Sequence, residues 1–156
     1  MRNEWTVQAG DGVSFEDGAD RGRILVFGRD TGGRYSLLEW TVAVGDPSAE
    51  DAPRQYGVHR HHQIEETFYV RRGVLEFLLG DQVATLKAGD FVRVPPGVRH
   101  GYANVSDSEV ELLVGFHPGG FEELFIKYRT DQAEAPAGDG FIADATRHYA
   151  SEFETP

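Results

Sequence analysis

The chain has 156 residues, a hydrophobic share of 40% and no cysteine, so it can bury one core without disulfide bonds. Because there are no thiolates, imidazole and carboxylate groups must hold any metal ion, which argues against a cysteine-based structural zinc site. Acidic residues outnumber Lys and Arg by 26 to 15, and a net charge of −11 disfavours a nucleic-acid partner, whose phosphates it would repel.

Short segments of alternating or apolar character, separated by Gly, Asp, Asn or Pro, are typical of β-strands. They lie at residues 23–28, 35–43, 67–73, 74–80, 83–90, 91–96 and 110–116. Their spacing favours an all-β antiparallel sandwich or barrel over a βαβ fold. No apolar run approaches the length of a membrane span, and the first ten residues lack the apolar core of a signal peptide. We therefore expect a cytoplasmic protein with no membrane partner.

The remaining segments read as loops and helices. Residues 45–57 are polar, contain two prolines and predict a long loop. The spacing of Phe121, Leu124, Phe125 and Tyr128 predicts a helix with one apolar face over 119–129. A second, shorter helix is predicted over 144–153. We expect a single domain over 1–156, with a barrel core at about 24–116 and a helical extension at about 119–153.

Three histidines and two glutamates crowd into residues 59–66. On a strand, His59 and His61 share one face, whereas His62 points the other way. Glu66 begins the next strand, where an inward Glu66 places the apolar residues 68 and 70 on the same inner face. This consistency favours Glu66 over Glu65 as the inward carboxylate.

A second cluster lies downstream, where a Pro-Pro-Gly turn at 95–97 precedes a strand whose inward face carries His100 and Tyr102. His100 supplies a third imidazole. Three histidines and one glutamate suit a first-row divalent metal and leave room for a water molecule or a substrate. Fe, Ni, Mn, Co, Cu and Zn all remain open, with one ion expected per chain.

These two clusters resemble the two motifs of the cupin family. Residues 59–73 reproduce the His-x-His pair, the glutamate and the closing glycine of the first motif, although Pro53 stands where its opening glycine is expected. The second motif, Gly-x5-Pro-x-Gly-x2-His-x3-Asn, is matched at each fixed position from 89 to 104. The resemblance implies a small antiparallel jelly-roll β-barrel, the metal ligands His59, His61, Glu66 and His100, and a homodimer.

The segments "PGGFEELF" and "RHYASEFETP" are also similar to single-domain cupins of the quercetin 2,3-dioxygenase-like type. That similarity implies a metal-dependent dioxygenase that acts on a planar enol or phenol such as a flavonol, with Glu66 as the proton acceptor. A cyclase, isomerase or lyase that needs no oxygen would use the same residues, with Glu66 or Tyr102 moving a proton. A small-ligand-binding module without turnover is the third alternative.

Other polar and aromatic residues have simpler interpretations. His62 and Glu65 are expected to face outward, or to orient a metal-binding histidine from behind. His117 and His148 read as surface or interface histidines, and Asn104 as a structural residue that bonds the backbone. Tyr102 and Trp40 each have two interpretations: Tyr102 could pack in the barrel or act as an acid–base group, and Trp40 could belong to the core or line the pocket.

Overall fold

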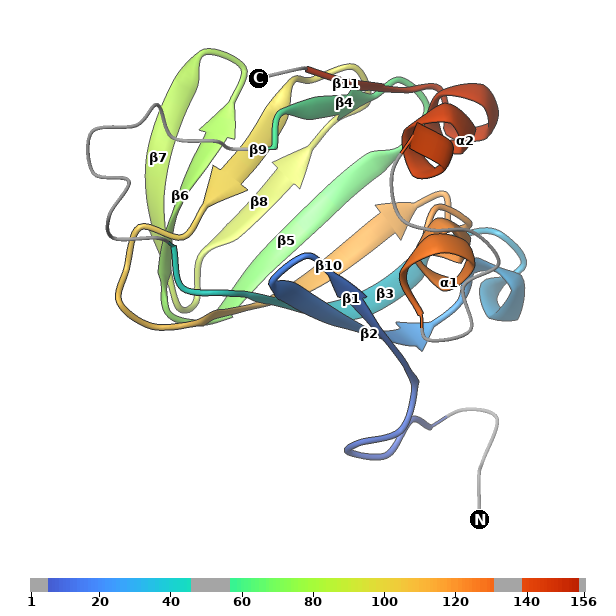
Figure 1. The fold of residues 1–156 in the computed structure, drawn as a ribbon, viewed down its shortest axis with the longest axis horizontal. Helices are drawn as coiled ribbons and strands as arrows, with labels where there is room; N and C mark the ends of the chain where they lie inside the picture. Colours follow the sequence, from blue (N-terminus) through green and yellow to red (C-terminus); the bar gives the residue numbers. More distant parts are fainter. Residues whose placement is uncertain (1–5, 46–56, 131–138, 155–156) are drawn as a thin grey trace.

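The computed structural model describes residues 6–45, 57–130 and 139–154, which form two antiparallel β-sheets that face each other (Figure 1). Pro53 and nearly all of the loop expected at 45–57 lie outside the described residues, as does most of the segment between the two predicted helices. The jelly-roll prediction is confirmed, since neighbouring strands in the chain repeatedly lie in opposite sheets. This alternation brings distant segments together between the sheets.

The first sheet has six strands in the order β1-β2-β3-β10-β5-β8. Their bounds are β1 Val13–Asp17, β2 Asp20–Val26, β3 Ser36–Val42, β10 Val110–His117, β5 Glu65–Arg72 and β8 Phe91–Val94. The second sheet has five strands in the order β11-β4-β9-β6-β7. Their bounds are β11 Ser151–Phe153, β4 His59–His61, β9 His100–Ala103, β6 Val74–Leu79 and β7 Gln82–Lys87.

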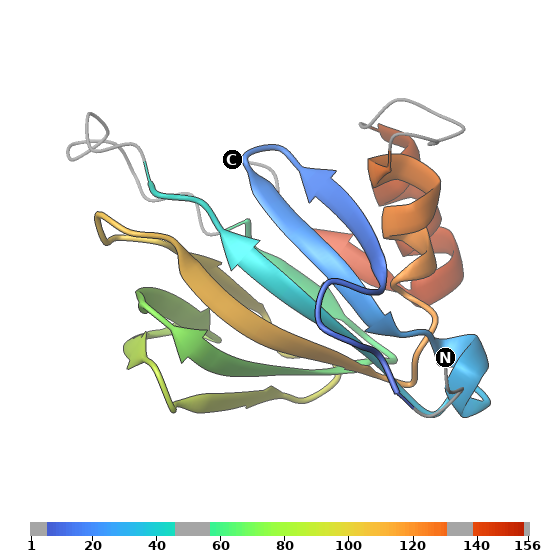
Figure 2. The ribbon, with the colours of Figure 1, turned by 90° about the horizontal axis from the view of Figure 1, so that it is seen from below.

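A short 3-10 helix, η1 (Gly28–Thr31), connects β2 to β3, and two α-helices follow β10. Helix α1 (Glu123–Arg129) and helix α2 (Asp139–Tyr149) lie side by side at one end of the two sheet layers (Figure 2). The predicted apolar face of α1 is confirmed, because Leu124, Phe125 and Tyr128 are buried. The helix itself begins at Glu123 rather than at 119, and the preceding Phe121 is buried in a turn.

The second predicted helix, over 144–153, is partly wrong. Helix α2 ends at Tyr149, and Ala150 adopts a left-handed conformation with φ 48°, which a helix does not accommodate. The next three residues form strand β11, which pairs with the edge of β4. Strand β1 was also missed, because the polar sequence around it, with Asp and Gly residues, reads as a loop.

The core between the sheets follows from the alternation of side chains along the strands. In β3, Leu38, Trp40 and Val42 face inward and are buried. In β5, Phe68 and Val70 are buried on the same face as Glu66, which is 5% exposed. The choice of Glu66 as the inward carboxylate therefore agrees with the structure.

Asn104 has the structural position that the sequence indicated. Its buried amide donates hydrogen bonds to the carbonyl oxygens of Ala43 (2.9 Å) and Ser108 (2.8 Å), and its Oδ1 accepts one from the backbone N–H of Ser106 (3.0 Å). These bonds tie the segment after β9 to the segment after β3. Within the described ranges, no helix is long and apolar enough to cross a membrane.

Candidate metal centre

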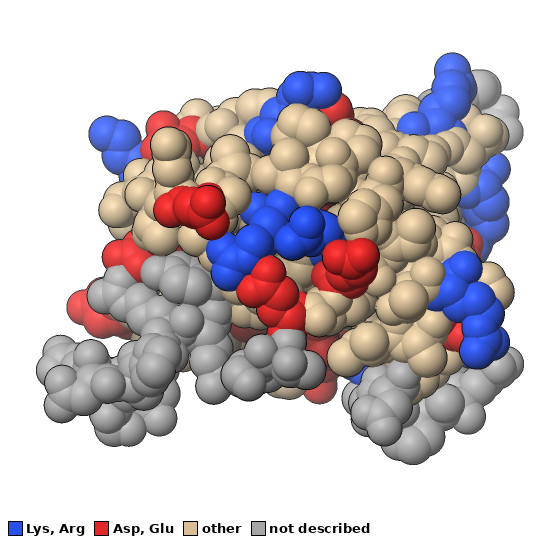
Figure 3. Space-filling model, turned by 90° about the horizontal axis from the view of Figure 1, so that it is seen from above, with Lys and Arg blue, Asp and Glu red and all other residues tan. Residues whose placement is uncertain are grey.

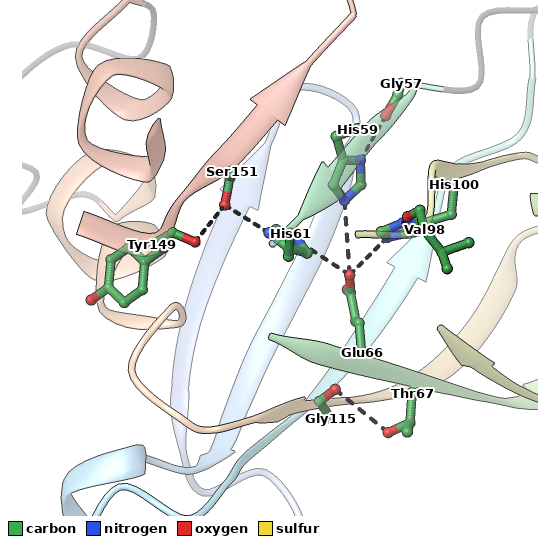
Figure 4. Close-up of polar contacts among 10 residues, drawn as sticks. All are labelled: Gly57, His59, His61, Glu66, Thr67, Val98, His100, Gly115, Tyr149 and Ser151. Carbon is green, nitrogen blue, oxygen red and sulfur yellow. Dashed lines mark hydrogen bonds and ion pairs between the residues drawn. The ribbon is translucent and has the colours of Figure 1, made fainter. Parts of the chain in front are cut away.

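Four side chains from three strands converge between the sheets (Figure 4). Strand β4 carries His59 and His61, β5 carries Glu66, and β9 carries His100. Glu66 Oε2 lies 3.0 Å from Nε2 of His100, 3.3 Å from that of His61 and 3.8 Å from that of His59. All four potential ligand atoms lie within 4.8 Å of one another. The structure thus brings together the whole ligand set that the sequence predicts.

Local turns and pairings explain this convergence. His59 and His100 face each other across the β4–β9 pair. The turn at Pro95–Val98 precedes β9 and contains Gly97 at φ 83°, a conformation that favours glycine. The backbone N–H of Gly97 donates a hydrogen bond to the carbonyl oxygen of His61 (2.7 Å). This bond fastens the start of β9 to the strand that carries the other two histidines.

Each histidine ring is held from its outer nitrogen. Nδ1 of His59 lies 2.8 Å from the carbonyl oxygen of Gly57, and Nδ1 of His100 lies 3.0 Å from that of Val98. Nδ1 of His61 lies 2.7 Å from the hydroxyl of Ser151 (Figure 4). A carbonyl can only accept, so at His59 and His100 a proton on Nδ1 makes the bond, and Nε2 is the nitrogen that faces the centre.

The electrostatics of the cluster arise from burial and from the carboxylate. Burial alone would raise the pKa of Glu66, but its contacts with the three imidazoles, His100 foremost, outweigh burial and hold that pKa well below its ordinary value. Burial lowers the pKa of His61, and Glu66 offsets only part of this effect. At His100, Glu66 outweighs burial and raises the pKa. Without a metal, His100 therefore binds a proton more readily and His61 less readily than a free imidazole, while Glu66 holds its negative charge.

The cluster fits a metal ion on a further observation. His61 Nε2 is fully buried and has no hydrogen-bond partner among the described residues, although it points at Glu66. A buried polar atom without a partner costs free energy, about 1–3 kcal/mol, and a cation shared with the other ligands would satisfy it. Three imidazole nitrogens and one carboxylate oxygen are a suitable set for Mn, Fe, Co, Ni, Cu or Zn.

A cavity of about 410 Å³ adjoins the cluster. It is lined by His59, His61 and Glu66, by the aromatic residues Trp40, Phe68, Tyr102, Phe116, Phe121, Phe125, Phe141 and Phe153, by the aliphatic residues Leu38, Val114 and Ile142, and by Gly57, Asp17, Asp20 and Arg129. Most of this lining is apolar or aromatic. The charged residues Asp17 and Arg129 form an ion pair with a separation of 2.6 Å. The cavity is therefore largely apolar, and His59, His61 and Glu66 form one part of its wall.

Trp40 and Tyr102 both have a place in this cavity and in the core. Trp40 donates a hydrogen bond from Nε1 to Asp20 (3.3 Å), and Tyr102 lies near the rings of Phe77 and Phe68. Burial, with smaller contributions from Asp20 and Glu66, raises the pKa of Tyr102 well above its ordinary value. Tyr102 therefore keeps its phenolic proton at neutral pH and can donate it but not act as a base.

The other candidate residues lie away from the centre. His62 is exposed, and its Nε2 lies 2.9 Å from a carboxylate oxygen of Glu152. Glu65 forms an ion pair with Arg93 on the neighbouring strand β8. His117 and His148 are exposed. Among the described residues, their side chains form hydrogen bonds or ion pairs with residues outside the metal cluster, which agrees with their outward interpretation.

Ser151 and Phe153 are site residues that the sequence did not indicate. Ser151 contacts His61, and the ring of Phe153 stacks on that of His59 with centroids 5.6 Å apart. Both residues belong to β11, which was expected to be helical. A three-residue strand is too short for its alternation to be recognised, so no signal in the sequence pointed to them.

Comparison with known proteins supports the fold. Residues 39–116 match the model of the cupin domain family. An uncharacterized protein of Methanocaldococcus jannaschii is 26% identical over 87 residues, which are 56% of this chain and 63% of that protein, less than two thirds of its length.

Solved structures with a similar fold come from several bacteria. A protein with a double-stranded β-helix domain from Klebsiella pneumoniae gives a TM-score of 0.57 at 20% identity, over 74% of this chain and 91% of that one. Pac13, a nucleoside dehydratase from Streptomyces, gives 0.58 at 16% identity, over 78% and 88%. A predicted oxalate decarboxylase from Thermotoga maritima gives 0.55 at 18% identity, over 64% and 80%. At these identities the likeness concerns the fold.

Proposed function

Because the chain belongs to the cupin domain family, we propose that it is a metal-dependent enzyme that acts on a small molecule, and specifically a dioxygenase of a planar enol or phenol. The observation that carries this proposal is the cluster of three histidines and Glu66, of which His59, His61 and Glu66 line a largely aromatic cavity. The fold itself does not select a reaction, so the argument rests on the site.

The size and lining of the cavity support a flat, apolar substrate. A volume of about 410 Å³ is within the usual range for small-molecule sites, about 300–1,000 Å³. Aromatic walls such as Trp40, Phe68 and Phe121 offer ring faces and edges against which a planar ring packs.

Within this site, each residue has a distinct task. A bound divalent ion would supply Lewis acidity that favours the deprotonated form of an enol or phenol oxygen. Glu66 is the only carboxylate among the four clustered residues and is ionised, so it is the group placed to accept the substrate's proton, although its lowered pKa makes it a weaker base than an ordinary carboxylate. The three imidazoles hold their Nε2 atoms toward the same point and surround that carboxylate.

A second candidate function is a cyclase, isomerase or lyase reaction that uses no oxygen. Tyr102 favours it, because a protonated phenol in the cavity wall can deliver a proton to a carbonyl or a leaving group while Glu66 removes one elsewhere. Two proteins of similar fold are named a nucleoside dehydratase and a predicted oxalate decarboxylase. Dehydration and decarboxylation are not oxygenation reactions, so these names are in keeping with the second candidate. A ligand-binding module without turnover is the third candidate.

One experiment separates these candidates. Purified protein is analysed for its metal content, and oxygen uptake is recorded on the same sample with a flavonol as probe. About one equivalent of a transition metal with oxygen consumption and ring cleavage supports the dioxygenase. Metal without oxygen uptake excludes the flavonol dioxygenase reaction, and product formation under anaerobic conditions then supports the second candidate. Protein that contains no metal and takes up none contradicts the proposal.

A further inference from the structure

Strand β11, near the carboxyl end of the chain, lies against the strand that carries two of the four clustered residues. In the antiparallel pair of β11 and β4, Ser151 faces His61 and Phe153 faces His59. Backbone bonds extend the pairing at both ends, from His62 N–H to the carbonyl of Ala150 (3.0 Å) and from Glu154 N–H to that of Val58 (2.8 Å). The segment that holds β4 from its outer edge is thus about 90 residues away in sequence.

Ion pairs on the surface hold the same segment in place. Arg60 of β4 lies 3.4 Å from Glu152, and Arg99, just before β9, lies 2.5 Å from Glu154. Seen from above, over the side where β4 and β11 lie in Figure 1, basic and acidic side chains sit next to one another (Figure 3). Exposed pairs of this kind contribute little each, so the backbone pairing is the main attachment.

The contact between Ser151 and His61 is buried and directional. Ser151 is 0% exposed, and its Oγ lies 2.7 Å from His61 Nδ1 and 3.4 Å from the carbonyl oxygen of Tyr149 (Figure 4). Since the carbonyl can only accept, the hydroxyl proton is directed at Tyr149, and an oxygen lone pair is left to accept the Nδ1 proton of His61. This arrangement favours the neutral tautomer of His61 whose Nε2 is free.

The three histidines differ in what holds them. The outer nitrogens of His59 and His100 bond to backbone carbonyls, of Gly57 and Val98, which no side-chain substitution removes. The outer nitrogen of His61 bonds to a side chain that a single substitution removes. Among the three histidines, His61 is the one whose Nε2 is fully buried without a hydrogen-bond partner in the described residues, so its ring depends most on the contact at Nδ1.

We propose that Ser151 is a positioning residue of the metal centre. Its hydroxyl holds His61 in the Nδ1–H tautomer, with Nε2 aimed at the point that His59, Glu66 and His100 share. The carboxyl-terminal strand is therefore part of the site and not a peripheral appendage. This inference rests on the metal site of the proposed function, but the tautomer of His61 is a property of the metal-free protein as well.

The first test compares Co²⁺ binding by the full chain and by three variants, using competition with a chelator and the visible spectrum of the bound ion. Ser151→Ala removes the acceptor, and we expect a loss of affinity of about 10–100-fold, the usual effect of losing a partner behind a metal-binding histidine, with altered bands. Ser151→Thr keeps a hydroxyl and is expected to restore most of the affinity. Wild-type affinity and spectrum in Ser151→Ala would overturn the inference.

Ser36→Ala is the matched control. Ser36 is also 0% exposed and lies in a strand, but its hydroxyl has no partner among the described residues and it is not one of the clustered residues. We expect its Co²⁺ affinity and spectrum to match those of the wild type. A loss in Ser36→Ala as large as that in Ser151→Ala would show that any buried hydroxyl has this effect, which would overturn the assignment to Ser151.

The second test is long-range ¹H–¹⁵N NMR of the histidine rings in the metal-free protein. We expect the Nδ1–H tautomer for His61 in the wild type and a loss of that preference in Ser151→Ala, with both proteins folded by circular dichroism. An Nε2–H tautomer in the wild type overturns the inference. If Co²⁺ does not bind but the tautomer depends on Ser151, the metal-dependent function fails while the positioning role of Ser151 stands.

Discussion

Nε2 of His100 lies 3.0 Å from Oε2 of Glu66, although the two residues are 34 positions apart and belong to different sheets. His100 comes from β9 in the five-stranded sheet, and Glu66 from β5 in the six-stranded sheet. The contact therefore forms across the interior between the layers. Burying an ionised carboxylate is costly unless opposite charge or a cation compensates it, so both partners depend on the closed sandwich.

Removing His100 should weaken metal binding. In His100→Ala we expect a metal content well below one equivalent per chain. The loss of metal affinity should exceed the ~10–100-fold that is typical of losing a hydrogen-bond partner of a metal-binding histidine, because here a direct ligand is lost. Elemental analysis and chelator competition measure both quantities. His62→Ala is the control, because His62 is the neighbouring histidine that faces outward, and it should bind as the wild type does. Full occupancy in His100→Ala would contradict the ligand assignment.

Replacing Tyr102 by Phe keeps the ring against Phe77 and removes the phenolic proton. If Tyr102 is the proton donor of the second candidate reaction, turnover should fall by about 10²–10⁴-fold while the metal content stays the same. Tyr69→Phe on the outer face of β5 is the matched control, because that ring is 43% exposed. Turnover in Tyr102→Phe equal to that of the wild type would mean that Tyr102 only packs in the cavity wall.

The contact of Asp144 in α2 with Lys127 and Tyr128 in α1 should make the free energy of unfolding depend on pH under acidic conditions. Hydrogen bonds from Lys127 (2.5 Å) and then Tyr128 (2.7 Å) lower the pKa of Asp144 to about 2. The folded pKa lies below the unfolded value, so this contribution to stability is present above pH 4 and is lost as the pH falls toward 2.

In Asp144→Asn we accordingly expect lower stability at neutral pH and a shallower loss of stability between about pH 4 and pH 2. Urea unfolding at a series of pH values measures this change. Asp107→Asn, at an exposed loop position, is the control and should follow the wild-type curve. If the free energy of unfolding of Asp144→Asn falls between pH 4 and pH 2 as steeply as that of the wild type, Asp144 does not cause the acid dependence.

The homodimer implied by the resemblance to cupins stays a prediction. Two large apolar side chains on the outer face of the six-stranded sheet are in keeping with it, since Tyr69 and Phe91 oppose each other in the β5–β8 pair and are 43% and 61% exposed. Light scattering coupled to size exclusion should give twice the 17.3 kDa of one chain. A mass of one chain at micromolar concentration would show the prediction to be wrong.

The sequence predicted much of the site because strand alternation is a local rule. Once residues 66–70 are read as a strand, a period of two places Glu66 with Phe68 and Val70 without any tertiary information. The same rule puts His59 and His61 on one face. Where an element is short and its neighbours are polar, the rule fails, as it does for β1 and β11. The helix predicted over 144–153 continued through Ala150 because nothing in the local sequence signals its left-handed conformation.

By itself, the sequence determined the all-β class, the identity of the four clustered residues and the inward face of each strand that carries them. The tertiary structure alone decided how those strands meet, with Glu66 Oε2 between the Nε2 atoms of His59, His61 and His100, and which groups hold the rings from behind. The physical reason is distance along the chain. Side-chain direction depends on a residue's immediate neighbours, whereas the support of His61 by Ser151 comes from a strand 90 positions away and exists only after both sheets have closed.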